Sequence, residues 1–112
     1  MSENLSWQQA EARRDAGMEL AVEKADRDRE GWSGDALDCV EMFCKAHGAG
    51  HQFLTETVRL YAETFAIIEA PENERAWGAV MRRAAKDGLI RKAGYAPAAS
   101  SNLSPKVLWE VA

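Results

Sequence analysis

The sequence predicts a mainly α-helical domain of the α+β class that ends in a β-hairpin. Apolar residues recur at spacings of three and four through most of the chain, which is the pattern of helices with one buried face. Near the C-terminus apolar residues alternate instead, as in a strand, and glycine or proline stands between the segments. At 112 residues the chain has room for one domain with a modest core.

The first predicted helix begins at a capping box, Ser6 with Gln9, and ends at Gly31. Its apolar stripe is short and consists of Met18, Ala21, Val22 and Ala25. A stripe this thin favours a solvated helix that lies across the domain or leads into it, and a homodimer through this helix is the alternative. The chain is therefore divided into a charged N-terminal helix, residues 1–31, and a domain of residues 32–112.

Two more helices are expected before residue 70. Ser33 is expected to cap the first of them, and Gly48 to end it. Its buried face consists of Leu37, Val40, Phe43 and Cys44. Residues 51–53 are short enough for an edge strand, and Thr55 is expected to cap the next helix. The inward face of that helix consists of Val58, Tyr61, Ala62 and Phe65.

The fourth predicted helix covers residues 74–87 and is ended by Gly88. Its core face consists of Trp77, Val80, Met81 and Ala84. The opposite face is expected to be exposed and consists of Arg75, Ala79, Arg82, Arg83 and Lys86. This helix therefore turns an indole toward the interior and a row of cations toward solvent.

Two strands are expected after this helix, at residues 89–93 and 106–111, with a small-residue loop between them. Val107, Trp109 and Val111 alternate and are expected to face inward. Helix, strand, loop and returning strand in this order form the second half of a winged helix-turn-helix. The predicted fold is therefore a winged helix-turn-helix with an extra N-terminal helix and a C-terminal β-hairpin wing.

The charge is divided unevenly along the chain. Residues 1–70 contain 7 Lys and Arg against 14 Asp and Glu, a net charge of −7. Residues 71–112 contain 7 against 4, a net charge of +3, and the two parts add to the total of −4. Because salt screens charges beyond about 10 Å at 0.1 M, the basic part can bind an anion although the whole chain is acidic. Phosphate neutralisation dominates affinity for nucleic acid, so this part is the candidate DNA-binding surface.

The expected DNA contacts fall into three groups. Residues of the fourth helix are expected to enter the major groove, namely Ala79, Arg82, Arg83 and Lys86. Cations around it are expected to bind phosphates, namely Arg75, Arg91, Lys92 and Lys106. Weaker contacts are expected from the loop, namely Ser100, Ser101 and Asn102. Residues 96–105 contain no Lys or Arg, and a solvated helix face is the alternative interpretation of the arginines.

Several motifs in this half are shared with one known group of proteins. They are Phe53-Leu54-Thr55, the segment from Arg75 to Ala85, Gly88-Leu89-Ile90, Gly94-Tyr95 and Val107-Leu108-Trp109. On these motifs residues 51–111 resemble the small winged helix-turn-helix proteins encoded by bacteriophages and prophages. Arg14-Asp15-Ala16-Gly17 also resembles the leader helix ahead of that domain. The resemblance covers most of the chain and implies a winged helix and a DNA-binding role in transcriptional or replication control.

Metal, disulfide and enzyme chemistry are not expected. Cys39 and Cys44 are five residues apart on one helix, so they project about 140° from each other, which suits neither a disulfide nor a zinc site with His47 and His51. No glycine-rich phosphate loop, nucleophile elbow or HExxH motif occurs. No cofactor is expected.

No signal peptide or membrane span is expected either, which favours the cytoplasm of a bacterial host cell. The alternative function is that of a protein-interaction module on the same scaffold. In that case the acidic N-terminal region, or its thin apolar stripe, binds a host or phage protein. Loss of duplex affinity with rising salt separates the two functions.

Overall fold

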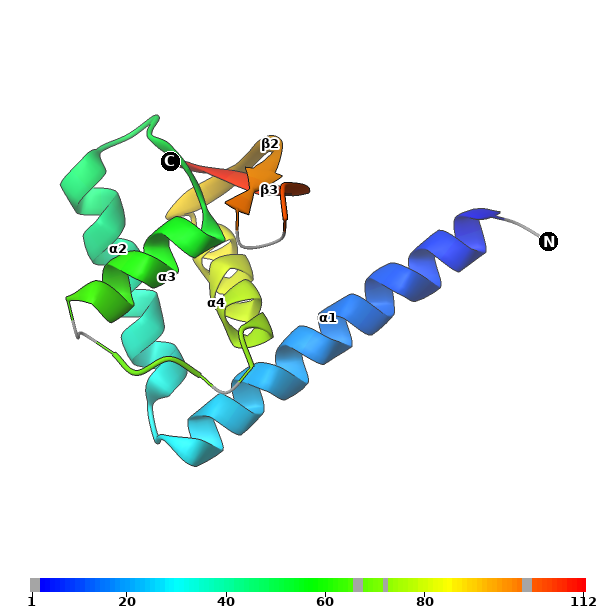
Figure 1. The fold of residues 1–112 in the computed structure, drawn as a ribbon, viewed down its shortest axis with the longest axis horizontal. Helices are drawn as coiled ribbons and strands as arrows, with labels where there is room; N and C mark the ends of the chain where they lie inside the picture. Colours follow the sequence, from blue (N-terminus) through cyan, green and yellow to red (C-terminus); the bar gives the residue numbers. More distant parts are fainter. Residues whose placement is uncertain (1–2, 66–67, 72, 100–101) are drawn as a thin grey trace.

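The structure, a computed structural model, describes residues 3–65, 68–71, 73–99 and 102–112, with side chains from residue 12 onward. These residues form four helices and three strands. In chain order they are α1 (Glu3–Asp28), α2 (Trp32–His47), β1 (Gln52–Leu54), α3 (Thr55–Thr64), α4 (Arg75–Lys86), β2 (Ile90–Ala98) and β3 (Ser104–Val111). The predicted α+β class is confirmed, as are the approximate limits of all four helices (Figure 1).

The three strands form one antiparallel sheet in the order β1-β3-β2. Phe53 pairs with Trp109 across β1 and β3, and Ile90 pairs with Val111 across β2 and β3. Trp109 and Val111 are buried, as their alternation predicts, so one face of the sheet covers the helices. The last strand therefore lies in the middle of the sheet, between the short edge strand and the long hairpin partner.

The hairpin is longer than predicted. β2 and β3 remain paired as far as Ala98 and Ser104, so most of the expected loop is strand. Asn102 and Leu103 have positive φ angles of 55° and 67°, the left-handed conformation that turns the chain back within a few residues. The small residues near position 96 were expected to form a loop. They form a strand because β2 is at the edge of the sheet, where proline is tolerated although it has no backbone N–H to donate.

The core is formed jointly by the helices and the sheet. Trp32 of α2 and Trp77 of α4 are both 1% exposed and meet edge to face, with ring centroids 5.5 Å apart. Phe43 and Met81 are also fully buried, and Val22 from α1 belongs to the same cluster. The C-terminal half of α1 therefore contributes to this core through Val22.

Helix α1 lies across α4 and then extends away from the rest of the chain toward its N-terminus (Figure 1). The predicted stripe of Ala21, Val22 and Ala25 is buried in this contact, and Met18 packs beside it. The stripe is thus occupied within the chain, so the dimer interface predicted for it is not available. Helix α1 also begins at Glu3, so the capping box expected at Ser6 is wrong: this residue lies inside the helix.

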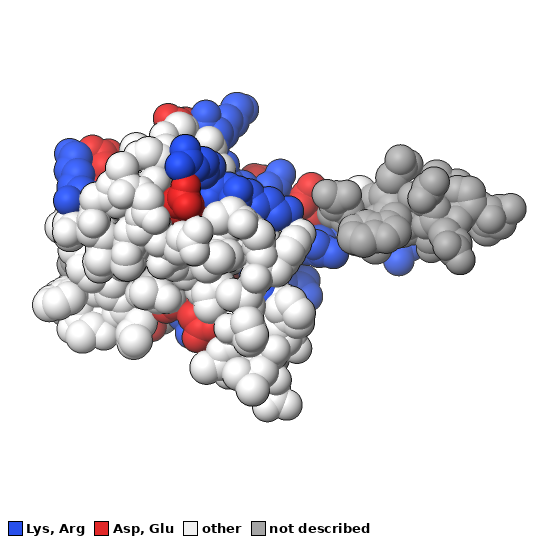
Figure 2. Space-filling model, turned by 90° about the horizontal axis from the view of Figure 1, so that it is seen from above, with Lys and Arg blue, Asp and Glu red and all other residues white. Residues whose placement is uncertain are grey.

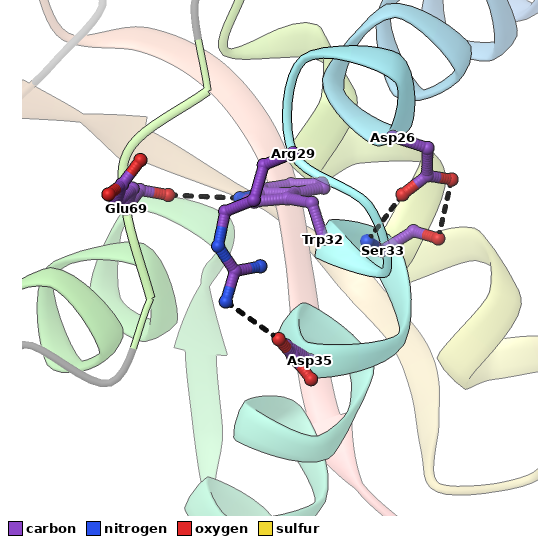
Figure 3. A network of polar contacts seen from close by, with 6 residues as sticks. All are labelled: Asp26, Arg29, Trp32, Ser33, Asp35 and Glu69. Atoms are coloured by element: carbon purple, nitrogen blue, oxygen red, sulfur yellow. Dashed lines mark hydrogen bonds and ion pairs between the residues drawn. The ribbon is translucent and has the colours of Figure 1, made fainter.

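The turn between α1 and α2 is closed by polar contacts (Figure 3). Ser33 was expected to cap α2, but the helix begins one residue earlier, after Gly31 in the left-handed conformation with φ 78°. The backbone N–H and the hydroxyl of Ser33 instead donate to the two carboxylate oxygens of Asp26, each at 2.8 Å. Nearby, Arg29 donates to Asp35 at 2.9 Å. The serine therefore joins two helices where a cap was predicted.

Two expectations for α3 are also wrong. Thr55 is the first residue of α3 and Leu54 occupies the cap position, so Thr55 does not cap the helix; its hydroxyl accepts a hydrogen bond from the Trp109 indole at 3.2 Å. Phe65 is 67% exposed because it follows the last turn of the helix, where the chain leaves the helical path. Val58 and Ala62 are buried as predicted. Among the described residues, no helix has the length and apolarity needed to cross a membrane.

Candidate nucleic-acid interface

Helix α4 turns its predicted core face inward, with Trp77, Val80 and Met81 at most 1% exposed. Ala79 was expected on the outer face, and this prediction is wrong because its exposure is 0%. The cause is that α1 and α2 both pack against α4, so more of its circumference is covered than packing on one side would cover. Ala79 therefore cannot contact a DNA base from this position.

Arg82 and Arg83, in the C-terminal half of α4, point toward α1 and remain partly exposed. Arg82 Nη1 lies 3.6 Å from Asp15 Oδ1, and Arg83 Nη2 lies 3.7 Å from Glu19 Oε2. All four side chains remain between 42% and 49% exposed. Ion pairs this long and this solvated contribute about 0–1 kcal/mol each, so a phosphate can replace the carboxylates.

Among the cations of the hairpin, Arg91 is the most strongly engaged. Its guanidinium donates to Glu110 Oε2, with Nε at 2.7 Å, because the two residues are cross-strand partners in β2 and β3. Gln52 donates to the other oxygen of Glu110 at 3.1 Å. The hydrogen bonds from Gln52 and Arg91 hold the pKa of the Glu110 carboxyl below its ordinary value. Arg91 is therefore held by its own sheet.

The other predicted hairpin contacts are less constrained. Lys106 is exposed, and the Lys92 ammonium lies 4.9 Å from the centroid of the Tyr95 ring. Asn102 is exposed at the hairpin turn, while Ser100 and Ser101 lie outside the described residues. Lys86 is exposed in the last turn of α4. Lys86, Lys92, Asn102 and Lys106 are therefore all exposed to solvent.

A cleft of about 510 Å³ opens between α1 and the β2–β3 hairpin, with residues of α3 and α4 between them. We call it the α1–hairpin cleft. Its basic lining residues are Arg14, Arg59, Arg75, Arg82, Lys92 and Lys106. Its acidic lining residues are Asp15, Glu56 and Glu74. Six cations and three carboxylates give the lining a formal charge of +3, opposite in sign to the charge of −4 on the chain.

The lining cations differ in how they are balanced. Arg59 Nη1 lies 2.7 Å from Glu74 Oε1, so this pair neutralises itself. Arg14, Arg75 and Lys106 form no ion pair with any side chain that the structure describes from residue 12 onward. Figure 2 shows Lys and Arg side chains gathered where α1 leaves the body, with fewer acidic side chains among them. The cleft therefore offers unbalanced positive charge to a ligand.

Apolar residues form the deeper part of the cleft, with Met18, Met81, Trp77 and Trp109 in its lining. The Trp109 indole is fixed by its hydrogen bond to Thr55. The Trp77 indole nitrogen is buried and has no hydrogen-bond partner among the described residues. Both rings are largely buried, at 1% and 8% exposure, so they support the cleft and do not present a stacking surface for bases.

The sequence prediction included four of the six lining cations and missed Arg14 and Arg59. A signal for Arg14 was present in the sequence. Arg14 precedes Met18 by four residues, so it continues the apolar stripe of α1 on the same side of the helix. Arg59 lies on α3, and its place in the cleft depends on how α3 packs beside α4. No local pattern gives that arrangement.

The cysteines and histidines of α2 do not form a common site. Cys39 and Cys44 are free and buried, and burial raises the pKa of both thiols, with smaller contributions from Asp35 at Cys39 and Glu41 at Cys44. His47 and His51 stack on each other at 4.3 Å near the end of α2. Within the described ranges, no three His, Cys, Asp or Glu side chains are grouped to hold a metal ion.

Comparisons with known proteins do not assign a function, so the function is inferred from the geometry. The chain matches no protein-family model, no curated protein and no solved structure. The cleft, its charges and the arrangement of α4 beside the hairpin are therefore the observations from which a function is inferred.

Proposed function

We propose that the chain binds double-stranded DNA as a winged helix-turn-helix protein. The element order α2-β1-α3-α4-β2-β3 and the sheet order β1-β3-β2 support this assignment, because a winged helix has the same order of helices, edge strand and hairpin. In this scheme α4 is the recognition helix, the β2–β3 hairpin is the wing, and α1 is an additional helix. A role in transcriptional or replication control of a phage or prophage belongs to the same proposal.

The observation that carries the proposal is the positive charge of the α1–hairpin cleft. A lining of +3 in a chain of −4 means that cations are concentrated beside α4 and the hairpin. Lys and Arg contacts to phosphates supply most of the affinity and the orientation of DNA-binding proteins. In the proposed complex, one DNA backbone contacts Arg75, Lys92 and Lys106.

The remaining predicted contacts have different roles in this scheme. Arg82 lines the cleft and reaches the DNA when its long ion pair to Asp15 is exchanged for a phosphate or a base edge. Lys86 extends the same surface along α4. Arg83 and Arg91 do not line the cleft. The long ion pair of Arg83 to Glu19 can be exchanged for a phosphate as that of Arg82 can, whereas Arg91 is held by Glu110 and contributes only to the field around the site.

The test is a titration of fluorescently labelled duplex with the protein and with two double variants. R75Q/K106Q removes two cleft cations, while R13Q/R27Q removes two exposed arginines of α1 that do not line the cleft. We expect R75Q/K106Q to lose about tenfold or more in affinity at about 50 mM salt and to reduce the salt slope by about two. The matched control has the same net charge and is expected to retain most of the affinity.

Two results reject the proposal. One is the absence of duplex binding by the unmodified protein at micromolar concentration and about 50 mM salt. The other is an equal loss in both double variants, because that result assigns the binding to net charge and not to the cleft. Thermal transitions of the variants provide the folding control, since the four replaced side chains are all exposed.

The second candidate is a protein-interaction module. The exposed apolar side chains of Tyr95 and Leu103 on the hairpin, at 63% and 69% exposure, favour it. A partner bound there through apolar contacts is retained when salt rises, whereas DNA bound through phosphates is released. Replacement of both residues by serine is expected to weaken such a protein complex and to leave duplex binding unchanged.

A further inference from the structure

Helix α1 is held so closely against α4 that it forms a fixed wall of the α1–hairpin cleft. A β-carbon at Gly17 would lie 3.1 Å from Arg75 Nη1, and one at Gly78 would lie 3.0 Å from the Met18 methyl carbon. A β-carbon at either position would require the facing side chain, Arg75 or Met18, to shift by a few tenths of an ångström. The residues of α1 next to this contact are therefore placed precisely relative to α4.

Arg14 is the residue that α1 contributes to the positive charge of the cleft. It is exposed, it lines the cleft, and it pairs with no carboxylate among the side chains that the structure describes from residue 12 onward. Lys92 and Lys106 line the same cleft from the hairpin. Cations therefore stand on both walls, and the space between them lacks a matching number of carboxylates.

The cleft admits one strand of a duplex and not the whole double helix. A volume of about 510 Å³ equals that of a cube with an edge of about 8 Å, which is well below the width of a duplex, whose major groove alone is about 12 Å wide. A sugar-phosphate backbone is narrow, carries one negative charge per nucleotide and meets cations on both of its sides. The dimensions and the charge of the cleft suit this part of the DNA.

We propose that α1 forms the second wall of the DNA-binding surface, where Arg14 contacts the phosphodiester backbone from the side opposite the hairpin. This inference rests on the proposed function and adds a clamp to it. One backbone lies between Arg14 on α1 and Lys106 on β3, above Arg75 of α4. The extra helix then increases DNA affinity, in contrast to an appendage that only covers the recognition helix.

Arg13 provides a matched control for Arg14. The two arginines are adjacent and exposed on the same helix, and only Arg14 lines the cleft. Successive residues of a helix project about 100° apart, so Arg13 points away from the direction of its neighbour. Replacing either one changes the net charge and the helix propensity equally. Any difference between the two variants therefore reports the position of the side chain.

The experiment compares the full chain with R14Q, R14K and R13Q in titrations of labelled duplex at several salt concentrations. We expect R14Q to bind about five to ten times more weakly at about 50 mM salt and to reduce the salt slope by about one. R14K retains the charge and is expected to remain within about twofold of the original affinity, as is R13Q. Thermal transitions of the three variants are expected to coincide because both positions are exposed.

The outcomes separate the clamp from the function on which it rests. If the unmodified chain binds duplex and R14Q binds as R13Q does, the clamp is rejected while DNA binding stands. If the unmodified chain does not bind duplex at all, the proposed function fails and the clamp fails with it. If R14K is as weak as R14Q while R13Q binds normally, the contact requires a guanidinium, as a bidentate hydrogen bond to a phosphate does, and the clamp stands as an arginine-specific contact.

Discussion

Gly78 of α4 faces Met18 of α1 so closely that a β-carbon on the glycine would lie 3.0 Å from the methionine sulfur. This contact is one of those through which α1 packs against α4, together with the buried Ala21, Val22 and Ala25. Gly78 is the only position in the interior of α4 without a side chain, and α1 passes over it. A glycine inside a helix costs about 1 kcal/mol relative to alanine, so the close approach of the two helices offsets a loss of helix propensity.

Replacing Gly78 with leucine is expected to lower the free energy of unfolding by about 1–3 kcal/mol. The new side chain has to displace Met18, and the buried contact of Val22 with the core is then strained. The measurement is urea denaturation followed by tryptophan fluorescence. A β-carbon at Gly34 of α2 would meet no atom of another described element within 4 Å, so G34L is expected to be neutral or stabilising. Equal destabilisation in both variants contradicts a specific contact at position 78.

The two central tryptophans are expected to respond differently to the same substitution. Both are 1% exposed, but the Trp32 indole donates to the Glu69 carbonyl at 2.9 Å, and the Trp77 indole has no partner among the described residues. W32F loses volume and a hydrogen bond, whereas W77F loses volume and an unsatisfied donor. We expect W32F to be less stable than W77F by about 1 kcal/mol in chemical denaturation. The reverse order is evidence that the Trp77 N–H is hydrogen-bonded in solution.

Because of the two buried thiols, the free energy of unfolding is expected to fall at alkaline pH. Burial raises the pKa of Cys39 and Cys44, so in the folded chain both stay protonated at a pH where the unfolded chain releases their protons. The contribution of the two thiols to the free energy of unfolding is complete below their pKa of about 8.5 in the unfolded chain. It is lost as the pH rises toward their higher pKa values in the folded chain, by up to about 1.4 kcal/mol per thiol and pH unit. Denaturation curves between about pH 7 and pH 10 measure this slope.

The double variant C39A/C44A is the control for that pH dependence. Lysine and tyrosine side chains also titrate in alkali, and they do so equally in both proteins. The variant is expected to be less stable at neutral pH because two buried side chains become smaller, yet its stability is expected to fall less steeply above about pH 8.5. Parallel curves for the two proteins contradict the assignment of the slope to the thiols.

Local patterns predicted most of the fold. The spacing of Trp77, Val80 and Met81 gave the buried face of α4, and the alternation of Trp109 and Val111 gave the inner face of β3. These patterns depend only on the geometry of a single element. The limits of the hairpin were less accurate, since small residues are compatible with both strand and loop. Pairing of Ala98 with Ser104 is decided by the partner strand and not by either residue alone.

The site was predicted less completely because it depends on contacts between elements. Ala79 is compatible with either side of α4, and its burial follows from the two helices that cover it. The engagement of Arg91 follows from the strand register, which places Glu110 directly opposite. Arg14 enters the cleft because α1 crosses α4. Each of these facts requires tertiary structure, whereas the positive charge of the C-terminal half was visible in the sequence.

The carboxylates that α1 places against α4 are expected to limit affinity for DNA. Asp15 and Glu19 lie within 4 Å of Arg82 and Arg83, so they compete with phosphates for the guanidiniums. D15N/E19Q is therefore expected to bind labelled duplex about three to ten times more tightly, at a cost in stability of about 0–2 kcal/mol. E23Q/E30Q makes the same change in net charge at exposed positions that form no ion pair with a described residue of α4. Because salt screens charges over about 10 Å, its gain is expected to be smaller. If both variants gain the same affinity for duplex, the effect is due to net charge. If D15N/E19Q gains no affinity, Arg82 and Arg83 do not belong to the DNA-binding surface.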